Sequence, residues 1–363
     1  MRTEGLRVIA GKEFHDHVRS RRFLSLLGIM LVIAAVGLAS GTVQYHKDLN
    51  NYNQARVAVG DDELAQTPLI TKPSPLFAFY EMALLLSSLG AVTGIAMGFD
   101  LVTREKESKS LKILLSHPIY RDEVITGKAL GGAAAIALAI LLFVGVSFAV
   151  LLASGVVPDL DESIRILIFG LLSFLMIVSF FALALFFSTV TKTSGSALVS
   201  TLIVFITLSS ATYLATSSAG ITLLIGDPPE MSGIEYQYSF MTGPNSETGI
   251  MGISDEGMAP GEFEERMEEY EIESKAYQGK RQAIEDMFNL ISPDRNYQEL
   301  TFAVVRPGLV AATLADGEIV SEDGLSALFT LLGSLASNIV AILVFPAAFF
   351  GLSWIRFVRE DIR

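Results

Sequence analysis

Long apolar runs dominate the pattern of this chain. Six of them carry almost no charged residue, and they span residues 23–43, 76–99, 129–157, 166–190, 194–225 and 325–355. A bilayer core about 30 Å thick needs roughly 20 mainly apolar residues in a helix. Helices in a soluble core seldom continue that long without a charge on any face. The pattern therefore predicts an all-α polytopic membrane protein with six transmembrane helices.

Composition supports this interpretation. The 363 residues are 51% hydrophobic and 18% charged, and none is cysteine. A disordered polymer needs fewer apolar residues, and disulfide-rich or zinc-ribbon domains need cysteine, so these classes are excluded. The first run could be mistaken for a signal peptide cleaved near residues 39–41. Because 22 residues precede a long apolar stretch, we expect an uncleaved span instead.

Charge is distributed unevenly between alternate loops. Segments 1–22, 100–128, 191–195 and 356–363 together hold 16 Lys and Arg against 10 Asp and Glu, whereas the remainder holds 10 against 29. Cytoplasmic loops carry the excess of Lys and Arg, so both termini are expected in the cytoplasm of a cell-membrane protein. This predicts an inner segment 1–22, spans one to five over 23–225, an outer loop 44–75 and a cytoplasmic loop 100–128. An extracellular domain 226–324, a sixth span 325–355 and a cytoplasmic tail 356–363 follow.

The predicted extracellular domain is acidic, with 21 Asp and Glu against 6 Lys and Arg. A helix is expected over 262–291, where apolar side chains recur near a helical period opposite an acidic face. The apolar positions are Phe263, Met267, Tyr270, Tyr277, Ile284 and Phe288. The acidic face could capture a cation or a basic peptide, but we favour a solvated helix surface.

Segment 100–128 is the most informative cytoplasmic part. We expect a helix over 101–115 with Leu111, Leu114 and Leu115 on one face, ended by Pro118 because the residue before proline disfavours helix. A second short helix starts near Arg121. Two short amphipathic helices suit contact with a cytoplasmic partner, and a solvated connector fits the residues equally well.

The order of residues in this segment resembles the signature of ABC type-2 transporter permeases. The matching positions are Arg104, Glu105, Ser110, Leu111, Leu114, Leu115, Pro118, Arg121, Gly127 and Lys128. The chain departs from the pattern at Lys109, where the family usually has glycine. Residues 7–22 are similar to the family's amphipathic entry helix, which would lie in the membrane interface. The number of spans is similar to the group that includes the permease of the nitrous-oxide-reductase maturation system.

The resemblance implies a permease subunit of an exporter, which would form its pathway as a homodimer or with a paralogous permease. Two copies of a separate cytoplasmic ABC ATPase would bind ATP and Mg²⁺, and this chain has no phosphate-binding Gly-x-x-x-x-Gly-Lys-Ser/Thr loop. The chain itself would be no enzyme, with no catalytic residue, metal, cofactor or nucleic-acid partner. Residues expected to couple to the ATPase are Arg104, Glu105, Glu107, Leu111, Leu114, Leu115 and Arg121. Those expected in the interfacial helix, against the lipid bilayer, are Lys12, Glu13, Phe14 and Arg19.

A polytopic membrane protein of this kind could have two other functions. A permease-like protein could transmit ATPase motion to an external partner without moving any substrate, and the sequence leaves this alternative open. An intramembrane enzyme would need paired aspartates, a His-Glu-x-x-His helix or a Ser-Lys pair, and none is present. His15 and His17 flank Asp16, but so few candidate ligands favour no metal site.

Two patterns within the spans concern packing. Small residues spaced by four allow close helix contact, and they include Gly90, Gly94, Gly98, Gly127 and Gly131. We favour packing within one subunit over a dimer seam for them. The fifth span is rich in hydroxyls, among them Ser200, Thr201, Thr207 and Ser210, which could line a pathway or pack between helices.

Two ionisable residues lie near the outer ends of predicted spans. Glu81 falls within the second span and Arg165 opens the fourth. The two could pair with each other. We favour snorkelling of both side chains to the interface.

Overall fold

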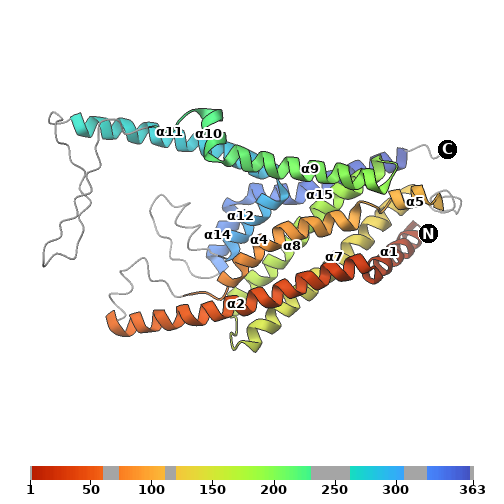
Figure 1. The fold of residues 1–363 in the computed structure, drawn as a ribbon, viewed down its shortest axis with the longest axis horizontal. Coiled ribbons are helices and arrows are strands. Elements are labelled where there is room, and N and C mark those ends of the chain that lie inside the picture. The colour runs from red at the N-terminus through yellow and green to blue at the C-terminus, as the bar shows by residue number, and fades with distance from the viewer. Residues whose placement is uncertain (1, 60–72, 111–119, 230–261, 306–324, 360–363) are drawn as a thin grey trace. The chain divides into compact units, whose positions relative to one another are not determined.

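The computed structural model describes residues 2–59, 73–110, 120–229, 262–305 and 325–359, and the regular elements in these ranges are helices (Figure 1). In chain order they are α1 (Arg2–Arg19), α2 (Arg21–Val59), α4 (Phe77–Gly98), α5 (Thr103–Glu107), α7 (Arg121–Ala153), α8 (Leu160–Val190), α9 (Ser194–Thr216), α10 (Ser218–Ile225), α11 (Glu262–Ile291), α12 (Pro293–Val305), α14 (Leu325–Ser334) and α15 (Ala336–Arg359).

Among the described residues, six helical segments are long and apolar enough to cross a membrane. They are Arg21–Ala58, Phe77–Glu107, Arg121–Ala153, Leu160–Val190, Ser194–Thr216 and Ala336–Arg359. Within a helix every backbone amide and carbonyl is satisfied locally, which is the condition for crossing lipid. The prediction of an all-helical chain with six membrane-crossing helices is confirmed.

The chain divides into two compact units. Unit 1 comprises Met1–Ser209 and Leu290–Arg363, and unit 2 comprises Ser210–Asn289. Unit 1 has one large apolar core contributed mainly by α4, α7 and α8, with α12 against α4, α8 and α15. In unit 1, α1, α5 and the C-terminal end of α15 lie at the same end of the helical bundle (Figure 1).

Small residues set the closest helix contacts in unit 1. A Cβ added at Gly94 of α4 would lie 2.4 Å from the carbonyl oxygen of Ile177 in α8. A Cβ at Gly131 of α7 would lie 2.7 Å from the carbonyl oxygen of Ala10 in α1. Such contacts bring backbones together where lipid provides no hydrophobic drive for association. The two predicted glycine stripes therefore face neighbouring helices of the same chain.

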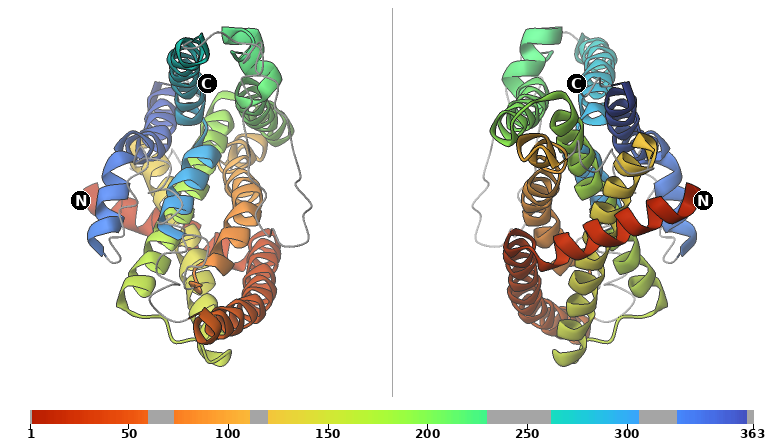
Figure 2. Two further views of the ribbon diagram at one scale, coloured as in Figure 1. Left: turned by 90° about the vertical axis from the view of Figure 1, so that its left-hand side faces the viewer. Right: turned by 90° about the vertical axis from the view of Figure 1, so that its right-hand side faces the viewer.

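The half-buried and buried residues of α1 form the stripe that packs on α7, and Figure 2 shows α1 crossing the bundle. Ser20 separates α1 from α2, and its Oγ accepts the backbone N–H of Phe23 at 3.1 Å. Serine is favoured before the first residue of a helix because its side chain accepts a hydrogen bond from an amide that has no partner within the helix. The chain thus turns from the entry helix into the first span at a single residue.

The first membrane-crossing helix, α2, is longer than the sequence indicates. Residues 44–59 were expected in a polar loop, yet α2 continues without a break to Val59. No glycine or proline occurs between Thr42 and Val59, so nothing in this stretch breaks a helix. The side chain of Gln44 also donates to Asp48 one turn further on, at 2.9 Å. Polarity alone was therefore a poor indicator of a loop.

The fifth and sixth apolar runs are each divided. Ser217 ends α9 and caps α10, since its Oγ accepts the N–H of Gly220 at 3.1 Å. Leu335 separates α14 from α15. Hydropathy does not register such breaks, because the residues at them are as apolar or as neutral as their neighbours. The predicted single helices over 194–225 and 325–355 are therefore wrong in detail.

Helix α12 belongs to unit 1, although the sequence places residues 226–324 in one outer domain. It has 13 residues, about 20 Å at 1.5 Å per residue, which is shorter than a bilayer core. The hydroxyl of its buried Tyr297 lies 3.0 Å from that of Ser173 in α8. Gln298 donates to Ser87 in α4 at 3.0 Å. Polar contacts thus fix α12 between two spans.

Unit 2 is described chiefly by α10 and α11. The bounds of α11, Glu262–Ile291, match the predicted helix. Met267, Tyr270 and Tyr277 are half-buried, whereas the intervening glutamates are exposed. The hydroxyl of Tyr277 donates to the carbonyl oxygen of Gly226 at 3.4 Å.

Candidate functional site around helix α5

Helix α5 is fixed at its N-terminal end by a serine from α8. The buried Oγ of Ser188 accepts the backbone N–H of Val102 at 2.9 Å and that of Thr103 at 3.1 Å. The first amides of a helix have no internal partner, so this hydroxyl replaces a cap from the preceding segment. The Oγ of Thr103 lies 3.0 Å from that of Ser194 at the start of α9. Five residues of helix are therefore held by two spans.

A buried cluster of three charges joins α5 to two other helices. The Nζ of Lys128 in α7 lies 2.7 Å from Oε1 of Glu13 in α1 and 2.7 Å from Oε1 of Glu105 in α5. The Lys128, Glu13 and Glu105 side chains are 2%, 4% and 15% exposed. Buried charges persist only when paired, and here one ammonium serves two carboxylates. Oε2 of Glu105 is buried without a hydrogen-bond partner among the described residues.

His17 lies beside this cluster in α1. Burial lowers the pKa of His17 below 6.5, and the cations of Arg104 and Lys128 act in the same direction. The carboxylates of Glu13 and Asp100 oppose this shift. Its buried Nε2 makes no hydrogen bond within the described residues. The imidazole is therefore a neutral member of a cluster otherwise made of charged groups at neutral pH.

The next two residues of α5 reach the turn between α8 and α9. Nζ of Lys106 donates to the carbonyl oxygens of Thr189 at 2.6 Å and Thr191 at 3.4 Å. Glu107 accepts the backbone N–H of Ser194 at 2.8 Å and its hydroxyl at 3.1 Å. Both charged side chains of this pair therefore make contacts within the chain.

Helix α5 is shorter than expected. It ends at Glu107, and Lys109 has φ of 57°, the one non-glycine residue with positive φ in the described part of the chain. The N–H of Lys109 donates to the carbonyl oxygen of Lys106 at 3.2 Å, as is usual where a helix ends in a left-handed residue. The expected helix over 101–115 is therefore interrupted here. Left-handed backbone favours glycine, the residue that the family usually has at this position, so Lys109 adopts a conformation that suits the family's glycine better than a lysine.

The predicted coupling residues have different surroundings. Arg104 is exposed, whereas Glu105 and Glu107 are bound to Lys128 and Ser194 as described above. Arg121, at the start of α7, is half-buried. The predicted anchors Leu111, Leu114 and Leu115 lie outside the described residues. Their role in ATPase contact stays a prediction.

The predicted interfacial residues of α1 point to two sides. Lys12 and Arg19 are exposed, while Glu13 is buried and Phe14 is half-buried against the core. Below them, exposed Arg22 pairs with Asp100 at 2.7 Å, and its guanidinium carbon lies 5.3 Å from the centre of the Phe99 ring. The apolar side of α1 is therefore covered by protein and its basic side is exposed, and the placement of α1 at the membrane interface stays a prediction.

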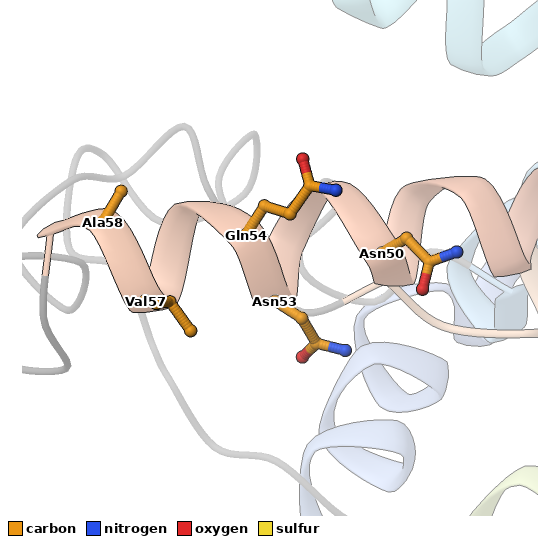
Figure 3. A pocket seen from close by; sticks show the side chains of 5 residues that line it. All are labelled: Asn50, Asn53, Gln54, Val57 and Ala58. Carbon is orange, nitrogen blue, oxygen red and sulfur yellow. The ribbon is translucent and has the colours of Figure 1, made fainter.

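The hydroxyls singled out in the fifth span differ in their exposure. Thr201 is buried and donates to the carbonyl oxygen of Ala197 at 2.7 Å. Ser200 is half-buried, and Thr207 and Ser210 are exposed. A hollow of about 430 Å³ occurs instead on the last turns of α2 (Figure 3). Uncharged side chains line it, namely Asn50, Asn53, Gln54, Val57 and Ala58.

Arg165 is placed otherwise than the sequence suggests. It is 2% exposed, and its Nε donates to Asp161 at 2.7 Å while its Nη1 donates to the carbonyl oxygen of Val304 in α12 at 3.1 Å. Glu81 is exposed. The expected snorkelling of Arg165 is therefore wrong, because a carboxylate four residues earlier and a free helix-terminal carbonyl compensate its burial.

Sequence reasoning missed Lys128 and Lys106 as site residues. A signal existed for Lys128, because an ionisable group next to a span of small apolar residues needs a partner within the protein. Nothing in the local sequence indicated that Lys106 reaches Thr189, which lies 83 positions away along the chain.

Comparison with known proteins agrees with these features. Residues 7–362 match the family described as ABC-2 family transporter protein. Over 162 residues the chain is 26% identical to the probable ABC transporter permease protein NosY of Pseudomonas aeruginosa, covering 45% of this chain and 50% of that relative. The chain therefore aligns with half of the length of this relative. With six membrane-crossing helices and a family match over nearly its whole length, the chain belongs to the ABC-2 transporter family, as a membrane permease of an ATP-binding cassette transporter.

Proposed function

We propose that this chain is the permease subunit of an exporter, that it works as a dimer with itself or a paralogous permease, and that separate cytoplasmic ATPase subunits drive it. In this proposal both termini and α5 lie in the cytoplasm. ATP and Mg²⁺ are bound by the ATPase, and this chain contributes the coupling surface and the pathway.

One observation carries the proposal. Helix α5 is a short element that lies at the same end of unit 1 as α1 and the C-terminal end of α15. Its Arg104 is exposed, whereas its other charged side chains contact other helices of the bundle. The segments that flank the spans at this end carry the excess of basic residues. A small element tied firmly to several spans is suited to receive a force from a docked subunit.

The outer surfaces of the spans support the dimer. The most apolar windows of the first, fifth and sixth spans are only 22%, 17% and 22% buried within the chain. Their exposed side chains include Val199, Ile203 and Ile206 of α9 and Val340 and Val344 of α15. Faces of this kind are covered by lipid or by a second permease.

A charge reversal tests the coupling surface. In co-purification with its ATPase from membranes, Arg104→Glu should weaken binding at least about tenfold, since it reverses an exposed charge at the docking site. The permease-dependent stimulation of ATP hydrolysis should fall with it. Lys280→Glu in α11, which lies on the outer side in this proposal, makes the same reversal of charge at an exposed position and should leave both unchanged. Wild-type binding by the Arg104 variant would refute the assignment.

The second candidate function is transmission of force to an external partner without transport. It is favoured by the 30-residue helix α11, which exposes a group of acidic side chains, namely Glu265, Glu268, Glu269, Glu271 and Glu273. Hydrolysis by the reconstituted complex separates the two functions. A transporter should respond to a small molecule or lipid, whereas a force transmitter should respond only to an added extracellular protein.

A further inference from the structure

The turn between α8 and α9 brings two opposite helix ends together. Helix α8 ends at Val190 and α9 begins at Ser194. The end of a helix leaves carbonyl oxygens without partners and carries negative partial charge, while the start of a helix leaves amides without partners and carries positive partial charge. A protein group that binds this turn therefore meets both kinds of charge a few residues apart.

Adjacent residues of α5 have the charges that the two ends require. The ammonium of Lys106 lies at the α8 end, on the carbonyl oxygens of Thr189 and Thr191, and the carboxylate of Glu107 lies at the α9 end, on the amide and hydroxyl of Ser194. The contact of Thr103 with Ser194 adds a neutral link. The order Lys-Glu thus matches the order of the helix ends.

These contacts differ in kind from those of Glu105. The Lys128 cluster joins α5 to α1 and α7, whereas Glu107 is attached to the first residue of α9. A displacement of α5 therefore acts directly on the end of the fifth span. A two-point attachment to a backbone amide and a hydroxyl resists both sliding and rotation of that end.

We infer that Glu107 is a positioning residue that makes α9 follow the movement of α5, with Lys106 holding the register of the turn. The inference rests on the proposed function, in which an ATPase moves α5. It deepens that function by naming the link through which the movement reaches the hydroxyl-rich fifth span. Glu107 in this role acts on α9 and leaves ATPase docking to the exposed side of α5.

The absence of cysteine from the sequence permits a clean reporter on α9. Ser200→Cys places a single thiol at a half-buried position of that helix. In the full-length chain with its ATPase in lipid nanodiscs, the rate at which a maleimide modifies this thiol is measured without nucleotide and with Mg-ATP and vanadate. We expect the two rates to differ at least about fivefold, in the range of ordinary allosteric coupling.

The decisive variant exchanges the two charges, Lys106→Glu with Glu107→Lys, in the reporter chain. Composition and net charge are unchanged, but each helix end now meets the wrong sign. The nucleotide dependence of modification should be lost while ATPase binding stays within about twofold of wild type. Glu107→Gln, which keeps a hydrogen-bond acceptor but no charge, should lose part of the nucleotide dependence. The exposed ion pair of α11 supplies a matched exchange, Glu271→Lys with Lys275→Glu, which should change nothing.

The possible outcomes distinguish a failure of the role of Glu107 from a failure of the proposed function. A charge-exchanged chain that keeps the full nucleotide dependence, or a wild-type reporter that shows none, would overturn the role of Glu107. If the exchanged chain purifies as an aggregate, Glu107→Gln decides alone. Failure of the wild-type chain to bind the ATPase would overturn the proposed function and this inference with it.

Discussion

At the scale of single residues, Lys128 of α7 joins α1 and α5 through two ion pairs. Two carboxylates share its ammonium, so the cluster keeps one net negative charge in a nearly water-free place. A buried ion pair contributes little net stability against an apolar replacement, but removing one partner leaves a charge that nothing compensates. Loss of Lys128 is especially costly because the carboxylates of Glu13 and Glu105 both pair with its ammonium.

Lys128→Met should therefore destabilise the folded chain by about 3–5 kcal/mol, the usual cost of breaking a buried ion pair. The measurement is denaturant-induced unfolding in detergent micelles. Adding Glu13→Gln and Glu105→Gln to the same chain should restore most of the loss, because the unpaired charges are then gone. Equal stability of Lys128→Met and wild type would mean that the cluster is solvated.

At the scale of elements, the end of α5 is a strained feature. A residue with a side chain in left-handed backbone costs about 1–2 kcal/mol relative to right-handed backbone, and Lys109 occupies such a conformation. The strain is the local cost of ending the helix after five residues.

Lys109→Gly should stabilise the chain by about 1 kcal/mol, because glycine adopts this backbone without steric cost. The control is Ser108→Gly, whose φ of −77° and ψ of −4° are open to any residue, and which should cost up to about 1 kcal/mol. Unfolding curves of the two variants compare them directly. A loss of stability in Lys109→Gly would show that the lysine side chain has a stabilising contact of its own.

The elements also show how far the sequence predicts the fold. Spans could be predicted because lipid demands about 20 apolar residues, whatever else surrounds them. The breaks within the fifth and sixth runs and the end of α2 could not be predicted, since Ser217 and Leu335 interrupt helices without any change in hydropathy, and the polar residues after Val43 continue a helix. Hydropathy measures the environment of a segment and carries little information on where its backbone changes direction.

For the candidate site too, the sequence predicts one part, its location, and leaves another part, its contacts, unpredicted. Segment 100–128 could be selected because its residues resemble a family pattern, but the contacts that organise it join residues far apart in sequence. Glu13 and Lys128 are 115 positions apart, and Glu107 and Ser194 are 87 apart. Such pairs depend on how the spans pack, which no local pattern encodes.

At the scale of the whole molecule, the uneven distribution of charge predicts which ends of the spans are cytoplasmic. The net charge of −13 combines a basic set of short segments with an acidic remainder. Its physical consequence is orientation in the membrane, because the K/R bias of short loops sets topology.

Single cysteines can test this orientation. In intact cells a membrane-impermeant maleimide should label Glu273→Cys in α11 at once and Lys192→Cys in the α8–α9 turn only after the membrane is opened, since both positions are exposed on the protein. The untouched chain has no thiol to label and is the blank. The reverse order of labelling would place the termini outside and remove α5 from reach of a cytoplasmic ATPase.

The distance in sequence between Glu13 and Lys128 has a consequence for synthesis of the protein. The ribosome makes α1 first, and 115 further residues must follow before its ammonium partner exists. At 5–20 residues per second this takes roughly 6–23 s. During that time the first two spans are synthesised, before Glu13 can pair with Lys128. Docking of the first helix to be synthesised is therefore a late event, completed only when the third span has been inserted.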